Sequence, residues 1–191
     1  MDVNRVLPEL RDVLDRLPPF RLPEDLYEAR NNPRPPFQKS DRVAIHDETI
    51  KGAGGQDMLV RVYEPTDGPV SGRPAFLWIH GGGYVLGHPD YDDNLCQTFV
   101  EAAGCVVFSP DYRLAPEHPF PAGLEDCYAA LVWLHESAAR YGIDTTRVAI
   151  GGASAGGGLT AALSLLARDR GGPSICFQMP LYPMIDDRNV L

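Results

Sequence analysis

Apolar and polar residues fall in alternating blocks along most of this chain, and the blocks predict short strands separated by helices. Continuous apolar runs at 75–80 (AFLWIH), 105–109 (CVVFS) and 147–151 (RVAIG) are typical of strands buried on both faces of a sheet. Between them lie segments with helical spacing of apolar residues, or segments rich in alanine and leucine. We predict helices over 92–103, 124–141 and 155–168, and a last strand over 174–181.

A hairpin precedes these units. Residues 42–50 and 58–63 read as two strands, and the glycine-rich stretch 52–55 (GAGG) supplies the turn between them. Buried strands that alternate with helices indicate a parallel α/β sheet with helices on both faces. The predicted fold is therefore a mostly parallel sheet with this antiparallel hairpin at its N-terminal edge.

The first 40 residues have a different texture. Leu7, Leu10, Val13, Leu14 and Leu17 fall at helical spacing, and a proline pair at 18–19 ends the pattern. An apolar stripe of this kind is more often a packing surface than a membrane contact. We predict a helical appendage over 1–40 that lies on an α/β core over 41–191.

Composition narrows the classes of partner and chemistry. The 191 residues suit one domain with a small appendage, and the net charge of −9 argues against a nucleic-acid partner. Lys39 and Lys51 are the only lysines, so a lysine-dependent phosphate loop or Schiff base is excluded from the stretches that look catalytic. The four cysteines include no CxxC pair, which argues against a zinc or redox site.

The sequence shows the features of neither a secretory signal peptide nor a membrane-spanning stretch. The N-terminus is charged throughout and has no apolar signal region, so we expect reduced thiols and a cytoplasmic protein. The most apolar long stretch, 153–167, is too short and too rich in glycine to span a bilayer. We therefore expect no membrane partner.

One motif offers a nucleophile. Residues 152–156 (GASAG) fit G-x-S-x-G, follow the predicted strand 147–151 directly and open the helix at 155. A serine between strand and helix sits on a tight, strained turn that requires small neighbours, and its hydroxyl points above the sheet. We predict Ser154 as the nucleophile. The alternative is a glycine-rich turn that merely binds an anion.

A second motif offers hydrogen-bond donors. His80 and three glycines (HGGG, 80–83) come at the end of the strand 75–80, and glycines let backbone N–H groups face a substrate oxygen. This is the layout of an oxyanion hole in lipases and esterases, whereas the alternative is a flexible turn. Neither a phosphate-loop motif nor an in-frame G-x-G-x-x-G occurs here, so a dinucleotide site is disfavoured.

Four stretches together resemble the hormone-sensitive-lipase-like esterases of the α/β-hydrolase fold. The resemblance implies that fold, with an N-terminal cap piece that suits residues 1–40. It also implies Ser154 as nucleophile, backbone donors from Gly82, Gly83 and Ala155, and hydrolysis of short- to medium-chain carboxylic esters without a cofactor. The matching stretches are HGGGYVLG (80–87), DYRLAPEHPFPA (111–122), GGASAGG (151–157) and LYPMIDDR (181–188).

The chain departs from the family in two ways. Ala153 stands where members often carry an acidic residue, a mild change. More seriously, the fold orders its triad as serine, acid, histidine, and no histidine follows Ser154. The family's acid and base would lie on later strands that this sequence lacks. Asp186 and Asp187 follow the last strand, where some α/β hydrolases place the acid, but with no histidine to orient, a turn that supports the pocket is the better interpretation.

Upstream histidines are weak substitutes for the base. His88 follows the glycine loop and His118 lies in a loop after a parallel strand, so both could approach the serine. In the family, the stretch that holds Asp111, Arg113, Glu117 and His118 is structural, and we read these residues as loop anchors. A serine without its base is a weak nucleophile, so we expect feeble activity at best.

Three functions stay open on the sequence alone. The first is an ester hydrolase of which this chain is an N-terminal part. The second is a catalytically inactive small-molecule-binding protein on the same scaffold. The third is an amidase or deacetylase, which the nucleophile motif does not distinguish from an esterase. The expected partner is a small-molecule ester, and formation of a homo-oligomer is left open.

Overall fold

A computed structural model describes residues 6–16, 21, 24–31, 36–186 and 188. The chain divides into two compact units, Met1–Asn32 and Pro33–Leu191. The first contains the predicted amphipathic helix, α1 (Pro8–Arg16), followed by α2 (Leu26–Arg30). On α1, the side chains of Leu10 and Val13 are about half exposed. Leu17 and the side chain of Leu14 lie outside the described residues, and the role of 1–40 as a cap stays a prediction.

The second unit is built on a six-stranded sheet with the order β1-β2-β4-β3-β5-β6. The strands β1 and β2 form the predicted antiparallel hairpin, and β2 pairs antiparallel with β4. The remaining pairs are parallel, as predicted. The strand bounds are β1 Val43–Lys51, β2 Asp57–Pro65, β3 Arg73–Ile79, β4 Val106–Pro110, β5 Ile143–Ala153 and β6 Phe177–Leu181.

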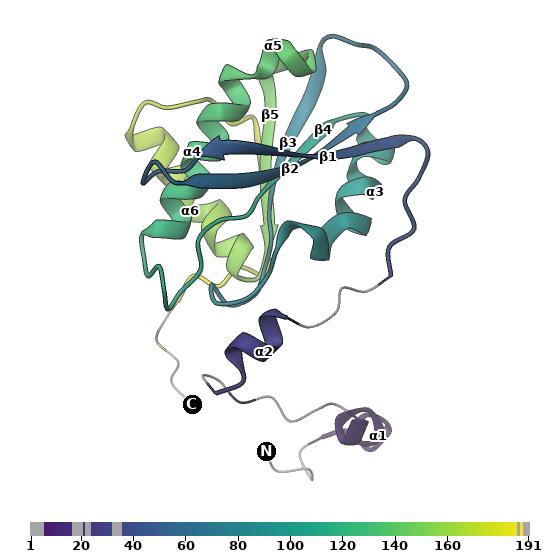
Figure 1. The fold of residues 1–191 in the computed structure, drawn as a ribbon, viewed down its shortest axis with the longest axis vertical. Helices are drawn as coiled ribbons and strands as arrows, with labels where there is room; N and C mark the ends of the chain where they lie inside the picture. The colour runs from purple at the N-terminus through teal and green to yellow at the C-terminus, as the bar shows by residue number, and fades with distance from the viewer. Residues whose placement is uncertain (1–5, 17–20, 22–23, 32–35, 187, 189–191) are drawn as a thin grey trace. The chain divides into compact units, whose positions relative to one another are not determined.

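Helices cover both faces of the sheet (Figure 1). On one face lies α3 (Asp93–Ala103), which follows the short 3₁₀ helix η2 (Pro89–Asp92). The other face carries α4 (Ala122–Glu136) and α6 (Ala155–Asp169). A short helix, α5 (Ala138–Tyr141), extends α4, so the helix predicted over 124–141 is interrupted at Ser137.

The side-chain alternation of the central strands builds two separate cores. In β3, Leu77 and Ile79 face the core beneath α4 and α6, whereas Phe76 and Trp78 face the core beneath α3. The strand β4 divides in the same way, with Phe108 on the first side and Val107 on the second. Burial on both faces explains why these strands read as continuous apolar runs.

The strand β6 differs from this pattern because it lies at the end of the sheet. Its burial pattern is mostly exposed, and Phe177 is 59% exposed. It is also shorter than the predicted span 174–181, while β5 is longer than the predicted 147–151. Among the described helices, none combines the length and apolar character needed to cross a membrane.

Candidate active site

The sheet topology brings the two predicted motifs together. The strands β3 and β5 are parallel neighbours, with Ile79 opposite Gly152, although β4 comes between them in sequence. The glycine loop after β3 and the serine turn after β5 therefore start from adjacent points on the carboxyl edge of the sheet. This is the edge where ligands bind in open α/β sheets.

Ser154 sits on a strained turn between β5 and α6. Its backbone has φ 57° and ψ −115°, a region that L-residues rarely occupy and that persists only where the surroundings enforce it. The Ser154 N–H donates to Leu181 O at 3.0 Å, and its carbonyl accepts from the N–H groups of Gly158 and Met184, each at 3.0 Å. These bonds hold the predicted nucleophile in its unusual conformation.

Glycines flank the turn because no Cβ atom fits beside it. A Cβ on Gly156 would lie 2.0 Å from Ile79 O, and one on Gly152 would lie 2.5 Å from the Gly156 carbonyl carbon. The first turn of α6 therefore packs directly against backbone at the end of β3. This contact is the physical reason for both glycines of the G-x-S-x-G motif.

The glycine loop lies against this turn. A Cβ built on Gly81 would be 2.9 Å from Ala153 O and 3.6 Å from Ser154 Cβ. Gly82 and Gly83 both have positive φ, 123° and 62°. Within the described part of the chain, no acceptor is seen for the N–H groups of Gly82, Gly83 or Ala155. Three unpaired donors beside a strained serine can stabilise a developing oxyanion.

His80 anchors the start of the loop from inside the protein. Its ring is 1% exposed, stacks on Tyr112 with a centroid distance of 4.2 Å, and places Nδ1 2.7 Å from Gly81 O. Burial lowers the pKa of His80 to about 4, against the opposing effect of the Gly81 hydrogen bond. A neutral ring that donates to Gly81 is a structural anchor. Tyr112, whose hydroxyl donates to His80 O at 2.9 Å, was not singled out from the sequence.

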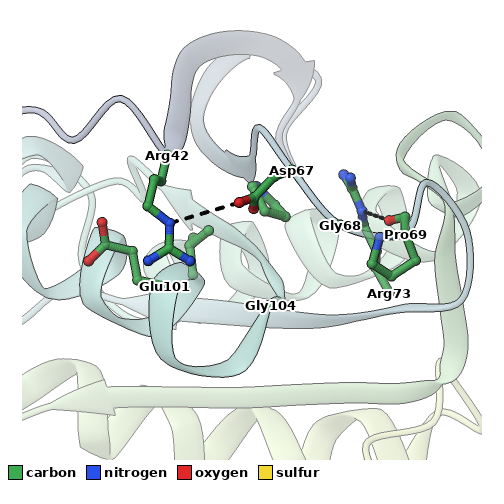
Figure 2. A pocket seen from close by; sticks show the side chains of 9 residues that line it. Arg42, Asp67, Gly68, Pro69, Arg73, Glu101 and Gly104 are labelled. Carbon is green, nitrogen blue, oxygen red and sulfur yellow. Dashed lines mark hydrogen bonds and ion pairs between the residues drawn. The ribbon is translucent and has the colours of Figure 1, made fainter.

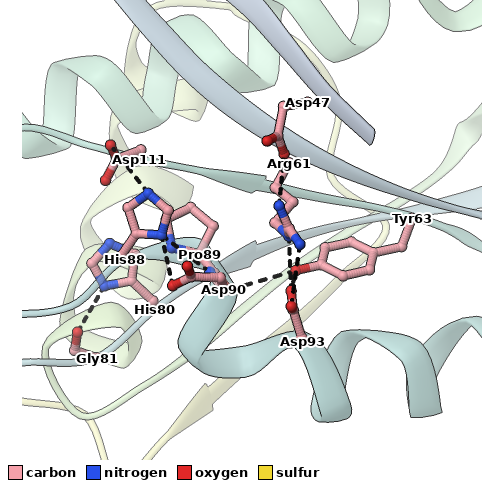
Figure 3. Close-up of polar contacts among 10 residues, drawn as sticks. All are labelled: Asp47, Arg61, Tyr63, His80, Gly81, His88, Pro89, Asp90, Asp93 and Asp111. Carbon is pink, nitrogen blue, oxygen red and sulfur yellow. Dashed lines mark hydrogen bonds and ion pairs between the residues drawn. The ribbon is translucent and has the colours of Figure 1, made fainter. Parts of the chain in front are cut away.

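A polar network holds the segment that follows the glycine loop (Figure 3). Asp93, at the start of α3, accepts hydrogen bonds from Arg61 Nε at 2.8 Å and from Tyr63 Oη at 2.7 Å. Next to it, Asp92 accepts from Trp78 Nε1 at 2.7 Å. These contacts fix η2 and the N-terminus of α3 to the sheet, and thereby fix the far end of the loop.

The loop after β4 has its own anchor. Asp126 is fully buried and accepts from Arg113 at Nε, 2.7 Å, and at Nη2, 3.0 Å. Burial would raise the pKa of Asp126, but hydrogen bonds from Arg113, Ala53 and Gln56 outweigh it and lower the pKa. Arg113 therefore makes the kind of anchoring contact expected for it.

The histidines proposed as substitute bases lie in different settings. His88 is held between two carboxylates, 2.7 Å from Asp90 and 3.8 Å from Asp111. His118 is exposed and lines a cavity beside the glycine loop. Over residues 36–186, no histidine contacts the Ser154 hydroxyl.

Among the described residues, Asp186, which follows β6, makes no hydrogen bond to Ser154 either. The Asp186 carboxylate pairs with Arg188 at 2.7 Å, and Asp187 lies outside the described residues. Nor do three His, Cys, Asp or Glu side chains gather at a metal-binding spacing anywhere in the described ranges. Within the described residues, the site thus consists of the predicted nucleophile, Ser154, and the unpaired N–H groups beside it.

A mostly apolar cavity of about 880 Å³ opens beside these residues. It extends from Gly83 and Tyr84 on the glycine loop to the part of α6 between Gly158 and Leu165. Its volume and lining suit a small apolar molecule. Members of the lining include Phe120, Leu159, Ala162, Leu165, Met184 and Ile185.

A smaller hollow of about 100 Å³ lies at the opposite end of β3 (Figure 2). Two arginines line it, but both already have partners: Arg42 pairs with Asp67 at 3.9 Å, and Arg73 Nε donates to Pro69 O. Glu101 adds a further negative charge. This hollow is therefore a poor anion site.

Comparison with known proteins identifies the family. Residues 76–190 match the family model for the alpha/beta hydrolase fold. The chain is 43% identical to esterase LipI of Mycobacterium tuberculosis over 183 residues, covering 92% of this chain and 56% of LipI. It is 41% identical to carboxylesterase NlhH of the same organism, again covering 56% of the relative. The chain thus spans little more than half the length of these relatives.

Solved structures agree. A bacterial heroin esterase superposes with a TM-score of 0.81 at 36% identity, covering 98% of this chain and 61% of that one. An esterase from Pyrobaculum calidifontis gives a TM-score of 0.77 at 38% identity, covering 93% and 58%. Sequence motifs, sheet topology and these likenesses coincide, and the chain belongs to the hormone-sensitive-lipase-like esterases of the α/β-hydrolase fold.

Proposed function

We propose that this chain carries the nucleophile and the oxyanion donors of a serine hydrolase for short- to medium-chain carboxylic esters. The observation that carries the proposal is the strained Ser154 turn beside the unpaired N–H groups of Gly82, Gly83 and Ala155. Relatives named as esterases, of which this chain spans little more than half, support the same reaction.

The proposed chemistry follows from this arrangement. Ser154 Oγ attacks the ester carbonyl carbon, and the carbonyl π electrons move onto oxygen to give a tetrahedral oxyanion. The three N–H donors stabilise that charge. Collapse breaks the bond to the alcohol, which leaves with a proton, and the acyl group stays on Ser154. Water then attacks the acyl carbon, the bond to Ser154 Oγ breaks, and the carboxylic acid leaves as the Ser154 hydroxyl regains its proton.

A general base must take the Ser154 proton, and we propose that none of the five histidines of this sequence does so. His80 is buried and donates to Gly81, and His88 is held by carboxylates. His46 on β1 pairs with Glu48 of the same strand and with Glu64 of β2, and His135 belongs to α4. His118 is exposed in the loop after β4. In subtilisin, removing the histidine costs about 10⁶ in kcat, so the chain by itself should turn over esters feebly.

Rescue by free imidazole tests both parts of the proposal. p-Nitrophenyl butyrate hydrolysis is measured for the parent and Ser154→Ala, with and without imidazole, and the Ser154 peptide is examined for a butyryl adduct. We expect near-background rates without imidazole. With imidazole we expect the parent to exceed the rate of Ser154→Ala and to form an adduct that Ser154→Ala lacks. Since imidazole itself cleaves such esters, Ser154→Ala supplies the blank.

Two results would contradict the proposal. Rapid hydrolysis without imidazole that Ser154→Ala abolishes would show a base within this chain, and His88→Ala and His118→Ala would locate it. A folded parent that behaves like Ser154→Ala under every condition would remove the nucleophile role.

The second candidate is a non-catalytic binding protein, favoured by the apolar cavity and by the absence of a histidine at Ser154 within the described residues. Saturable binding of unreacted butyrate ester without any adduct would support it.

A further inference from the structure

Tyr84 occupies a conformation that usually belongs to glycine. It directly follows the HGGG stretch and has φ 65°. Such a conformation is unfavourable for a residue with a side chain and requires compensating contacts. Two are present: the Tyr84 carbonyl accepts from Ala115 N–H at 3.0 Å, and the Tyr84 hydroxyl donates to Met184 O at 2.7 Å. The hydroxyl bond joins residues 100 positions apart.

Met184 belongs to the segment that clasps the nucleophile turn. Its N–H donates to Ser154 O at 3.0 Å, while Leu181 O accepts from Ser154 N–H at 3.0 Å. Residues 181–184 thus bind both backbone polar groups of Ser154. The Tyr84 hydroxyl binds the carbonyl of the same residue whose N–H holds Ser154.

Tyr84 and Met184 also pack against Gly158, and we call the contact among these three residues the junction. A Cβ at Gly158 would lie 2.3 Å from Tyr84 Oη and 2.2 Å from Met184 O. Tyr84, Met184 and the first turn of α6 therefore meet with no spare volume. Burial raises the pKa of Tyr84, so the hydroxyl keeps its proton and remains a donor at neutral pH.

We propose that Tyr84 is a positioning residue whose hydroxyl sets the distance between the oxyanion donors of the glycine loop and Ser154, by tying that loop to segment 181–184. The kinetic part of this inference rests on the proposed ester hydrolysis. A phenylalanine at 84 keeps the ring and removes only the tie.

The first test measures the junction without any reaction. Backbone hydrogen exchange is compared for the parent, Tyr84→Phe and Tyr128→Phe. Tyr128 is the matched control because it belongs to α4, outside the junction, and its ring centroid lies 4.8 Å from the guanidinium carbon of Arg170. We expect Tyr84→Phe to speed exchange at Met184 and Ser154 about tenfold and to leave β4 unchanged, because only the local bond is lost. Unchanged exchange at both amides would overturn the proposal.

The second test measures kcat and KM for the Ser154-dependent hydrolysis of p-nitrophenyl butyrate in the presence of imidazole. We expect Tyr84→Phe to lower the Ser154-dependent kcat about tenfold and to keep KM within about twofold, since the donors act on the transition state. A Tyr84→Phe rate equal to the parent rate, where Ser154→Ala abolishes it, would overturn the positioning role. If Ser154→Ala has no effect in the parent, the proposed function fails, and hydrogen exchange alone decides whether Tyr84 ties the two segments.

Discussion

Gly156 rests on Ile79: a Cβ atom at position 156 would lie 2.0 Å from the Ile79 carbonyl oxygen. The start of α6 and the end of β3 are therefore in backbone contact, and this contact places the serine turn against the glycine loop. Because both partners are backbone, neither can move aside to accommodate a Cβ atom at position 156.

Gly156→Ala should consequently destabilise the protein by about 3 kcal/mol, the upper range for overpacking a rigid site. The control is Gly171→Ala, since Gly171 has φ 58° but nothing within 4 Å of the added Cβ. That variant should lose only about 1 kcal/mol, from the left-handed conformation itself. Urea unfolding measures both free energies. Equal losses in the two variants would mean that the contact with Ile79 does not matter.

His80 should make stability depend on pH in a defined window. Its pKa is lowered to about 4 in the folded protein, and an unfolded histidine titrates near 6.5. Between these pH values His80 is protonated in the unfolded chain and neutral in the folded protein. The contribution of neutral His80 to the free energy of unfolding is therefore fully present above pH ~6.5, and that free energy falls by about 3 kcal/mol as the pH drops to ~4. His80→Asn keeps a donor for Gly81 and should remove most of this dependence. Parallel pH profiles for parent and variant would contradict the assignment.

Asp126 should make the free energy of unfolding depend on pH in a lower range than His80 does. The pKa of Asp126 is lower in the folded protein than the ordinary value of ~3.9 in the unfolded chain. The stabilisation by the ionised carboxylate is therefore fully present above pH ~3.9 and is lost as the pH falls through the pKa of the folded state. Asp126→Asn should cost about 3 kcal/mol at neutral pH because it breaks a buried pair with Arg113. The exposed pair of Arg168 with Asp169 is the control, and Asp169→Asn should change stability by less than about 0.5 kcal/mol. Chemical unfolding at pH 7 distinguishes the two.

Thiol labelling should find a single reactive cysteine in the folded protein. Cys176 is exposed, whereas Cys96, Cys105 and Cys127 are buried, and burial raises the pKa of Cys105 to about 11. A thiol reagent should modify Cys176 quickly and reach all four cysteines only in denaturant. The variant Cys176→Ser should show no fast phase. Fast labelling of a second thiol would show that the α3 or α4 packing opens readily.

The sequence predicted the elements whose signal is local. Leu77 and Trp78 lie in an unbroken apolar run because adjacent residues of β3 fill opposite cores, and that run is readable without a structure. The glycines at 152 and 156 were equally readable, since only small residues fit a strand-to-helix turn of this kind. That the glycine loop and Ser154 start from adjacent points of one sheet edge came from the strand order of the structure.

What the sequence did not predict depends on distant partners. Tyr84 and Met184 are 100 residues apart, and nothing in either stretch indicates that their atoms meet. The bond from Gln56 to Asp126 spans 70 residues in the same way. The break at Ser137 was missed because apolar spacing continues through it, although the helix path changes there.

The clasp on Ser154 also has a consequence for which changes this chain can accept in evolution. Leu181 and Met184 hold the serine with main-chain atoms, so those bonds make no demand on the identity of either side chain. They do demand that two residues, and no other number, separate the two positions. Side chains there are free to vary within their packing, whereas a single insertion or deletion between 181 and 184 would disturb the spacing that both bonds to Ser154 require. We therefore expect related chains to keep the length of this loop more strictly than its composition.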